Sequence, residues 1–195
     1  INNLSKWSYP NVSIPANDDI MLWAANNDRS QITSARTLIN QGDIFKYLIP
    51  SSEPNSNWTD INFNDSNWNN GPSGFGYADG DDATIIPNGT LSLYLRKNFN
   101  IDNIDEVISL ILDIDYDDAF VAYINGIEIA RANINGVPPP FNASTNQDHE
   151  AQIYTGGVPE RFSISDFSSI LVEGNYVLAI QAHNVSSWSS DFTII

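Results

Sequence analysis

Short runs in which apolar and polar residues alternate recur along this chain, and they limit its fold more than any other feature. In residues 91–97 apolar and polar side chains alternate one by one, as in a strand with one buried face. Two β-rich runs, 119–124 and 127–130, flank Asn125 and Gly126. This pair tolerates the positive φ angles of a type I′ turn, so the segment predicts a β-hairpin.

Other segments repeat this pattern, and none shows a helical period over more than a turn or two. Further strands are expected at residues 44–49, 107–112, 176–182 and 192–195. The run 107–112 is almost continuously apolar, which is typical of a strand buried on both sides. Many short strands without helical crossovers predict an all-β fold, an antiparallel β-sandwich of the jelly-roll type. Two long loops, at about 50–88 and 133–159, are expected to be functional or stabilised by ions.

Acidic side chains outnumber basic ones by 24 to 8, which gives a formal net charge of −16. Such a chain repels phosphate backbones and anionic lipid surfaces, so nucleic acid and membranes are not expected as partners. It attracts divalent cations, which relieve the repulsion between clustered carboxylates. The chain has no cysteine, so its core, bound ions or both must stabilise it. No apolar run approaches the roughly twenty residues that a membrane-spanning helix needs.

The N-terminal part of the chain differs from the rest. Two short β-like runs, at 7–17 and 20–25, precede a polar stretch. We therefore place a boundary near Asn40 and expect a β-like extension at residues 1–40 and a main domain at residues 41–195. No signal peptide is recognisable, and Asn, Asp, Ser and Thr are abundant. Both features are typical of a mature piece of a larger secreted or cell-surface protein.

Six blocks of sequence stand out along the main domain, at residues 42–48, 63–68, 74–84, 95–99, 117–126 and 175–180. In this order they resemble the galactose-binding-like jelly-roll domains of secreted multidomain bacterial proteins, which are similar to carbohydrate-binding modules. The resemblance covers residues 41–195 and implies carbohydrate binding as the usual function, although many members are spacers. Residues 7–29 resemble the end of a lamin-tail-like domain, which often precedes this jelly roll and implies neighbouring domains in the same chain.

The run Asp79-Gly80-Asp81-Asp82 is the sharpest candidate for a metal site. Three carboxylates within four residues, with a glycine that permits a tight turn, suit a hard cation such as Ca²⁺. The alternative is a solvated acidic turn. A second acidic group, Asp113, Asp115, Asp117 and Asp118, is interpreted as a strand end and a turn that enters the next strand.

Aromatic residues in loops or at strand ends are candidates to stack on the apolar face of a sugar. With a nearby hydrogen-bonding side chain, the expected ligand-binding residues are Trp58, Tyr77, Tyr116, Arg131 and Trp188. Arg96 and Asn184 are further polar candidates. Trp68 is expected to be a core anchor of the long loop.

Catalysis finds little support in the sequence. There is no cysteine and no Gly-x-Ser-x-Gly nucleophile elbow, and His149 and His183 are interpreted as solvated and locally hydrogen-bonded, respectively. We therefore expect a non-catalytic carbohydrate-binding or surface-adhesion module with structural Ca²⁺ and a polysaccharide or glycan as partner. The alternatives are a purely structural spacer and, with less support, a fragment of a glycoside hydrolase.

Overall fold

The computed structural model describes residues 35–171 and 174–195. Leu38–Ile195 form one compact unit. The β-like extension and its lamin-tail-like run lie outside the described residues, apart from the last few positions before Asn40. In the described part, no helix has the length and apolar character needed to cross a membrane.

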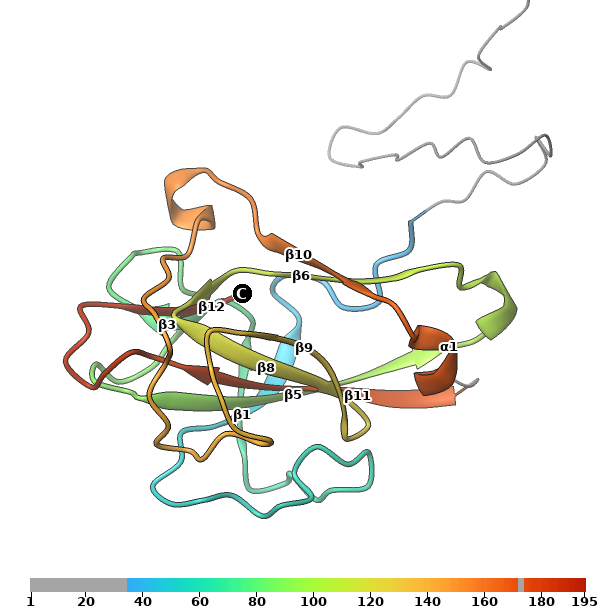
Figure 1. The fold of residues 1–195 in the computed structure, drawn as a ribbon, viewed down its shortest axis with the longest axis horizontal. Coiled ribbons are helices and arrows are strands. Elements are labelled where there is room, and N and C mark those ends of the chain that lie inside the picture. The colour runs from blue at the N-terminus through green and yellow to red at the C-terminus, as the bar shows by residue number, and fades with distance from the viewer. Residues whose placement is uncertain (1–34, 172–173) are drawn as a thin grey trace, which may run out of the picture. The chain divides into compact units, whose positions relative to one another are not determined.

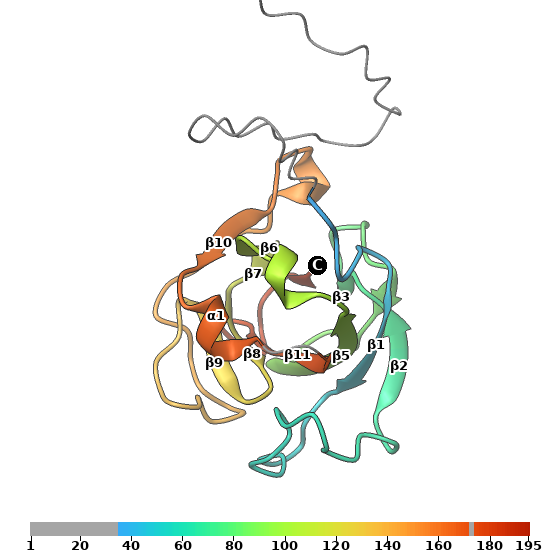
Figure 2. The ribbon, with the colours of Figure 1, turned by 90° about the vertical axis from the view of Figure 1, so that its right-hand side faces the viewer.

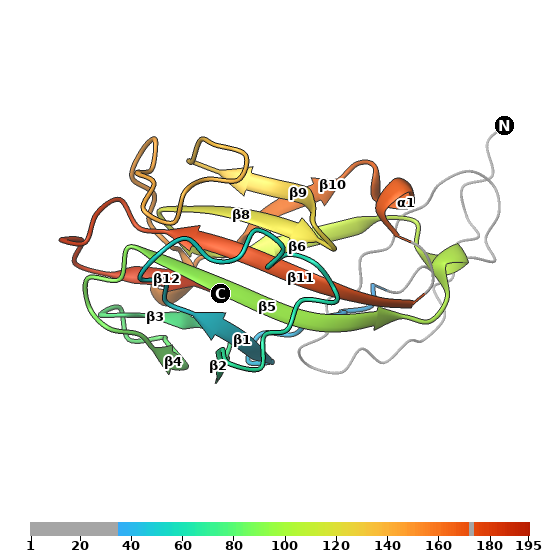
Figure 3. The same cartoon turned by 90° about the horizontal axis from the view of Figure 1, so that it is seen from below.

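A six-stranded antiparallel sheet forms one layer of the domain (Figures 1 and 3). Its strands, in spatial order, are β2 (Asn69–Pro72), β1 (Ile44–Leu48), β5 (Ser92–Ile101), β11 (Gly174–His183), β8 (Ala119–Ile124) and β9 (Ile127–Ala132). The two central strands, β5 and β11, pair along all ten residues of each. Strands far apart in the chain thus become neighbours, as a jelly roll requires.

The opposite layer is made of two smaller sheets (Figure 2). The four-stranded sheet contains β4 (Thr84–Ile85), β3 (Phe75–Tyr77), β12 (Phe192–Ile194) and β7 (Tyr116–Asp117), and the two-stranded sheet contains β6 (Leu110–Ile114) and β10 (Glu160–Ile164). The β3–β4 pair is parallel. Helical structure is limited to η1 (Ile104–Glu106), η2 (Ile153–Thr155) and α1 (Phe167–Ile170) in the described residues.

Alternation along β8 distributes its side chains between two hydrophobic cores. Phe120, Ala122 and Ile124 point into the main core between the layers. Val121 and Tyr123 point to the outer face of the large sheet, where a second core contains Trp58, Trp68 and Tyr94. Because the loop before β2 runs across this face (Figure 3), β8 is buried on both sides.

The predicted antiparallel β-sandwich is confirmed, and so is the hairpin, whose turn has φ of 47° at Asn125 and 85° at Gly126. The prediction of a strand buried on both sides at 107–112 is wrong. The chain instead passes from η1 to β6, and Ile108 and Ile111 are exposed. An apolar run alone cannot distinguish a buried strand from a surface segment next to the edge of a sheet. The long loop expected at 50–88 contains β2, β3 and β4.

Candidate functional site

Three carboxylates meet in the loop that follows β3. One oxygen from each of Asp79, Asp81 and Asp82 lies within 4.8 Å of the others. Asp79 Oδ1 and both oxygens of Asp81 and Asp82 are buried and have no hydrogen-bond partner among the described residues. Buried carboxylate oxygens without donors are costly, and oxygen ligands are what a calcium ion prefers. The donor set therefore fits a hard divalent cation, and it consists of the three residues selected from the sequence.

Two neighbouring strands position this loop. Asp82 lies over Gly76 of β3 so closely that a Cβ at Gly76 would come within 2.1 Å of Asp82 Oδ1. The Thr193 hydroxyl of β12 donates a hydrogen bond to Asp79 Oδ2. Gly80 makes the tight turn between the carboxylates with a φ of 89°. The carboxylates are thus placed by the sheet and not by the loop alone.

Electrostatic repulsion accumulates in this cluster. Burial, followed by repulsion from Asp79, raises the pKa of Asp82 to about 7. The same two causes raise the pKa of Asp81. No ion pair recorded between described residues involves these three carboxylates. A bound cation is therefore the direct way to stabilise the ionised cluster.

The second acidic group lies where β6 ends and the chain passes through β7 into β8, as the expected strand end and turn require, and three of its four members are buried. Asp113 is exposed and pairs with Arg161 at 2.7 Å. Asp115 accepts hydrogen bonds from two backbone N–H groups at the start of η2, at 2.8 to 2.9 Å. Asp118 accepts from the backbone N–H groups of His149 and Val185. Burial and the Asp118 charge raise the pKa of Asp117 to about 8. These strand-end carboxylates mainly anchor neighbouring loops.

The expectation of solvent-facing rings is wrong for three aromatic residues. Trp58 and Tyr77 are each 4% exposed and Tyr116 is 2% exposed. Each ring packs against other aromatic rings, and the alternation pattern of the sequence does not predict these contacts. The contacts are Trp58 with Tyr94, Tyr77 with Phe192, and Tyr116 with His149 and Phe120. Trp68 is buried in the second core, as expected.

Two arginine side chains, Arg96 and Arg131, hold neighbouring loops. Arg131 donates to both carboxylate oxygens of Glu128, at 2.5 and 2.6 Å, and to the carbonyl oxygens of Ile134 and Gly136. Four of the five N–H groups of its guanidinium are therefore used within the chain, and its role in ligand binding stays a prediction. Arg96 is 2% exposed and serves the loop before β2. Its position in an alternating strand gave no signal of this role.

Trp188 fits the expectation of a solvent-facing ring, since it is 92% exposed. It lies on the loop 184–191, which is held by hydrogen bonds within the loop. The backbone N–H of Trp188 donates to Ser186 Oγ at 3.1 Å, and the buried Asn184 side chain donates to the Asp191 carbonyl at 2.8 Å. The Tyr77 hydroxyl donates to the Ser189 carbonyl at 3.4 Å. Buried Tyr77 and Asn184 thus support the loop that presents Trp188.

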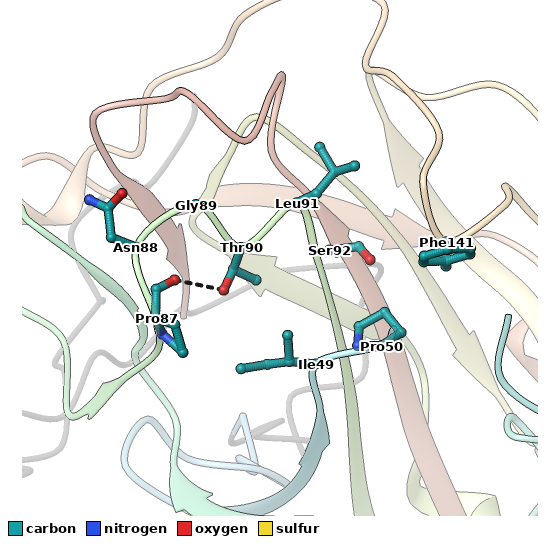
Figure 4. Close-up of a pocket in the computed structure, with 9 residues that line it drawn as sticks. All are labelled: Ile49, Pro50, Pro87, Asn88, Gly89, Thr90, Leu91, Ser92 and Phe141. Carbon is teal, nitrogen blue, oxygen red and sulfur yellow. Dashed lines mark hydrogen bonds between the residues drawn. The ribbon is translucent and has the colours of Figure 1, made fainter. Parts of the chain in front are cut away.

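A hollow of about 330 Å³ adjoins this loop (Figure 4). We call it the loop-end hollow; its lining includes Ile49, Asn88, Gly89, Thr90, Ser92 and Phe141. Gly89 connects the two features, because a Cβ there would lie 3.2 Å from the carbonyl oxygen of Ser187, the residue before Trp188. The residue before the exposed indole therefore approaches Gly89, one of the residues that line a hollow with hydroxyl, amide and apolar groups.

The two histidines make different contacts, although the backbone of each bonds to Asp118. The His149 ring is half-buried, stacks on Tyr116 at 4.1 Å and has Nδ1 2.9 Å from the Tyr116 carbonyl oxygen, so it is not simply solvated. His183 is fully buried, with Nε2 2.8 Å from Gln181 Nε2. Burial lowers the pKa of His183 to about 4. Both rings thus have structural contacts.

Comparison with known proteins gives distant matches. No protein-family model matches the chain, and no curated protein matches it. A β-glucuronidase from glycoside hydrolase family 2 superposes with a TM-score of 0.44 and 18% sequence identity, over 74% of this chain and 14% of that chain. A calcium-binding mutant of Bacteroides uniformis β-glucuronidase 2 superposes with a TM-score of 0.44 and 14% identity, over 81% of this chain and 17% of that chain. The chain spans less than a fifth of either protein, and likeness at this level assigns it no function.

Proposed function

We propose that the domain is a non-catalytic carbohydrate-binding or surface-adhesion module of a larger secreted or cell-surface protein, stabilised by calcium at Asp79, Asp81 and Asp82. The observation that carries the proposal is Trp188, an almost fully exposed indole on a hydrogen-bonded loop whose Ser187 carbonyl approaches Gly89 of the loop-end hollow. Indole presents a flat apolar face with a polar N–H, which suits the alternating C–H and O–H groups of a sugar ring.

The loop-end hollow supplies groups that complement such a ring. The Asn88 amide can both donate to and accept from sugar hydroxyls. Thr90 Oγ1 already donates to the Pro87 carbonyl at 2.7 Å (Figure 4), so its lone pairs are oriented as acceptors. The Phe141 and Ile49 side chains add apolar surface. This mixture of a few polar groups with apolar walls is typical of sites for small organic ligands.

Removing the indole tests the proposal. Trp188→Ala is expected to weaken binding to a retained polysaccharide by about 30-fold or more, because an exposed aromatic anchor contributes at least about 2 kcal/mol. The free energy of unfolding should change by no more than about 0.5 kcal/mol, since the side chain is exposed. Affinity electrophoresis through gels with different polysaccharides, followed by calorimetry, measures the binding.

Tyr154→Ala is the matched control, because it removes another exposed ring, one that is outside the loop 184–191 and does not line the loop-end hollow. It should leave polysaccharide retention unchanged. Retention of the Trp188→Ala protein equal to that of the unaltered protein would contradict the proposed site. If no polysaccharide retains the unaltered protein, the result favours a structural spacer over a carbohydrate-binding module.

Calcium binding at the three-carboxylate cluster is expected to weaken as the pH falls below about 7, because the ion must then displace a proton from Asp82. In calcium-free protein, this carboxyl group makes the stability of the fold change with pH in the opposite direction. A carboxyl group whose pKa is raised by folding stabilises the fold below its ordinary pKa of 3.8, and this contribution is lost as the pH rises through about 7. The difference in melting temperature between Ca²⁺ and EDTA should therefore be larger at pH 8 than at pH 5.5. Equal differences at both pH values would count against this linkage.

A further inference from the structure

The strand β6 has a free edge. Among residues 35–171 and 174–195, β6 pairs only with β10, so its other edge presents backbone N–H and C=O groups with no strand partner (Figure 2). Proteins commonly protect such edges with lysine or proline, and β6 contains neither. Its single charged residue, Asp113, pairs with Arg161 of β10. The free edge is therefore apolar and unprotected, as is typical of an edge that another strand covers.

The strand β12 lies in line with this edge. β12 pairs with β7 in antiparallel register, and the ladder runs on to Asp115 and Ile195, which exchange both backbone hydrogen bonds at 2.9 and 3.0 Å. Because β6 directly precedes Asp115, a strand that continues this ladder passes along the free edge of β6. Asp113 and Ile111 are two and four residues before Asp115, so their backbone groups point to the same side.

The side chains of β6 define what an added strand should carry. Leu110, Leu112 and Ile114 belong to or pack against the main core, whereas Ile111 and Asp113 are exposed. Opposed residues of antiparallel strands project from the same face of the sheet. An added strand therefore needs apolar side chains at the three positions opposite the core-facing residues, where they would cover the half-buried Leu110 and Leu112. The positions between them can be polar.

We infer that the free edge of β6 is an interaction surface that takes one further antiparallel strand, supplied by a neighbouring part of the same polypeptide in line with β12. Such a strand adds main-chain hydrogen bonds and covers the edge of the main core. A strand from a second copy is disfavoured, because each chain carries a net charge of −16 and the copies repel. The source of the strand rests on the proposed larger protein, whereas the free edge rests on the pairing of β6 and β12.

The test uses the whole chain with five residues added after Ile195, one for each residue of β6. The addition Val-Lys-Val-Thr-Val places valine opposite the three core-facing residues and lysine opposite Asp113. The matched control, Lys-Val-Thr-Val-Val, has the same composition but moves two of the three valines to the outer face. Hydrogen exchange of the Ile111 and Asp113 amides should be roughly 3–10-fold slower in the first protein than in the control, the value of one hydrogen bond.

Three outcomes would overturn the inference. Exchange at Ile111 and Asp113 that is the same in the extended and unaltered proteins would show that the edge takes no strand. Equal protection by both additions would show that the core-facing pattern plays no part. A dimer of the unaltered chain that protects these two amides, detected by sedimentation equilibrium, would assign the edge to a second copy. Polysaccharide retention tests the proposed function separately, since no residue of β6 lines the loop-end hollow.

Discussion

Replacement of Arg96 by alanine is expected to reduce the free energy of unfolding by about 3–5 kcal/mol, the cost of removing one partner from a buried charge network. Arg96 Nε donates to Asp65 Oδ2 at 2.8 Å, and its two terminal nitrogens donate to the carbonyls of Asp60 and Trp58. The guanidinium also lies over the Phe63 ring, 5.1 Å from its centroid. Without it, three acceptors lose their donor and the long loop loses its central attachment. Urea denaturation followed by tryptophan fluorescence measures the loss.

Two further variants sharpen this test. Arg96→Lys keeps the charge but offers one nitrogen in place of three, so most of the loss should remain. Arg161→Ala removes an arginine from a bidentate pair with Asp113 on the surface, and its cost should not exceed about 1 kcal/mol. Equal losses for Arg96→Ala and Arg161→Ala would contradict the assigned role of Arg96.

The second large effect is the stabilisation of the folded domain that we expect from bound calcium. At a free Ca²⁺ concentration a hundred times the dissociation constant, binding to the folded state alone adds about 2.7 kcal/mol. For a chain of this size, that raises the melting temperature by roughly 5–10 °C relative to EDTA. Scanning calorimetry at pH 8 with Ca²⁺ and with EDTA measures the difference. Magnesium should be a poor substitute, because it requires a smaller and more regular shell of oxygens.

The variant Asp82→Asn separates ion binding from simple repulsion. Its amide carries no charge and can donate to a neighbouring carboxylate, so in EDTA the variant should melt above the unaltered protein. It should gain little from Ca²⁺, because one charged ligand is lost. If the unaltered protein and the variant respond to Ca²⁺ alike, Asp82 is not a ligand. If neither responds, the cluster is an acidic turn.

Local signals determined much of what the sequence predicted correctly. The two-residue period of residues 91–97 follows from the backbone of an extended strand, and the Asn125-Gly126 turn follows from the positive φ angles that these two residues tolerate, so neither needs knowledge of distant segments. The cluster of Asp79, Asp81 and Asp82 was recognisable for the same reason, since its carboxylates are adjacent in sequence.

Only the tertiary structure decided which side chains are accessible. Trp58, Tyr77 and Tyr116 occupy the same kinds of loops and strand ends as Trp188, yet segments distant in the chain cover the first three rings. Arg96 sits in an ordinary alternating strand, but long-range contacts turn it into the anchor of a loop about thirty to forty residues earlier in the chain.

The sequence by itself thus determined the β-sandwich class, the central hairpin and the acidic cluster, because each depends on neighbours in the chain. The assignment of two faces to the large sheet was decided by the fold. An alternating strand has two sides, and only the packing of distant loops determines whether the second side meets water or a core.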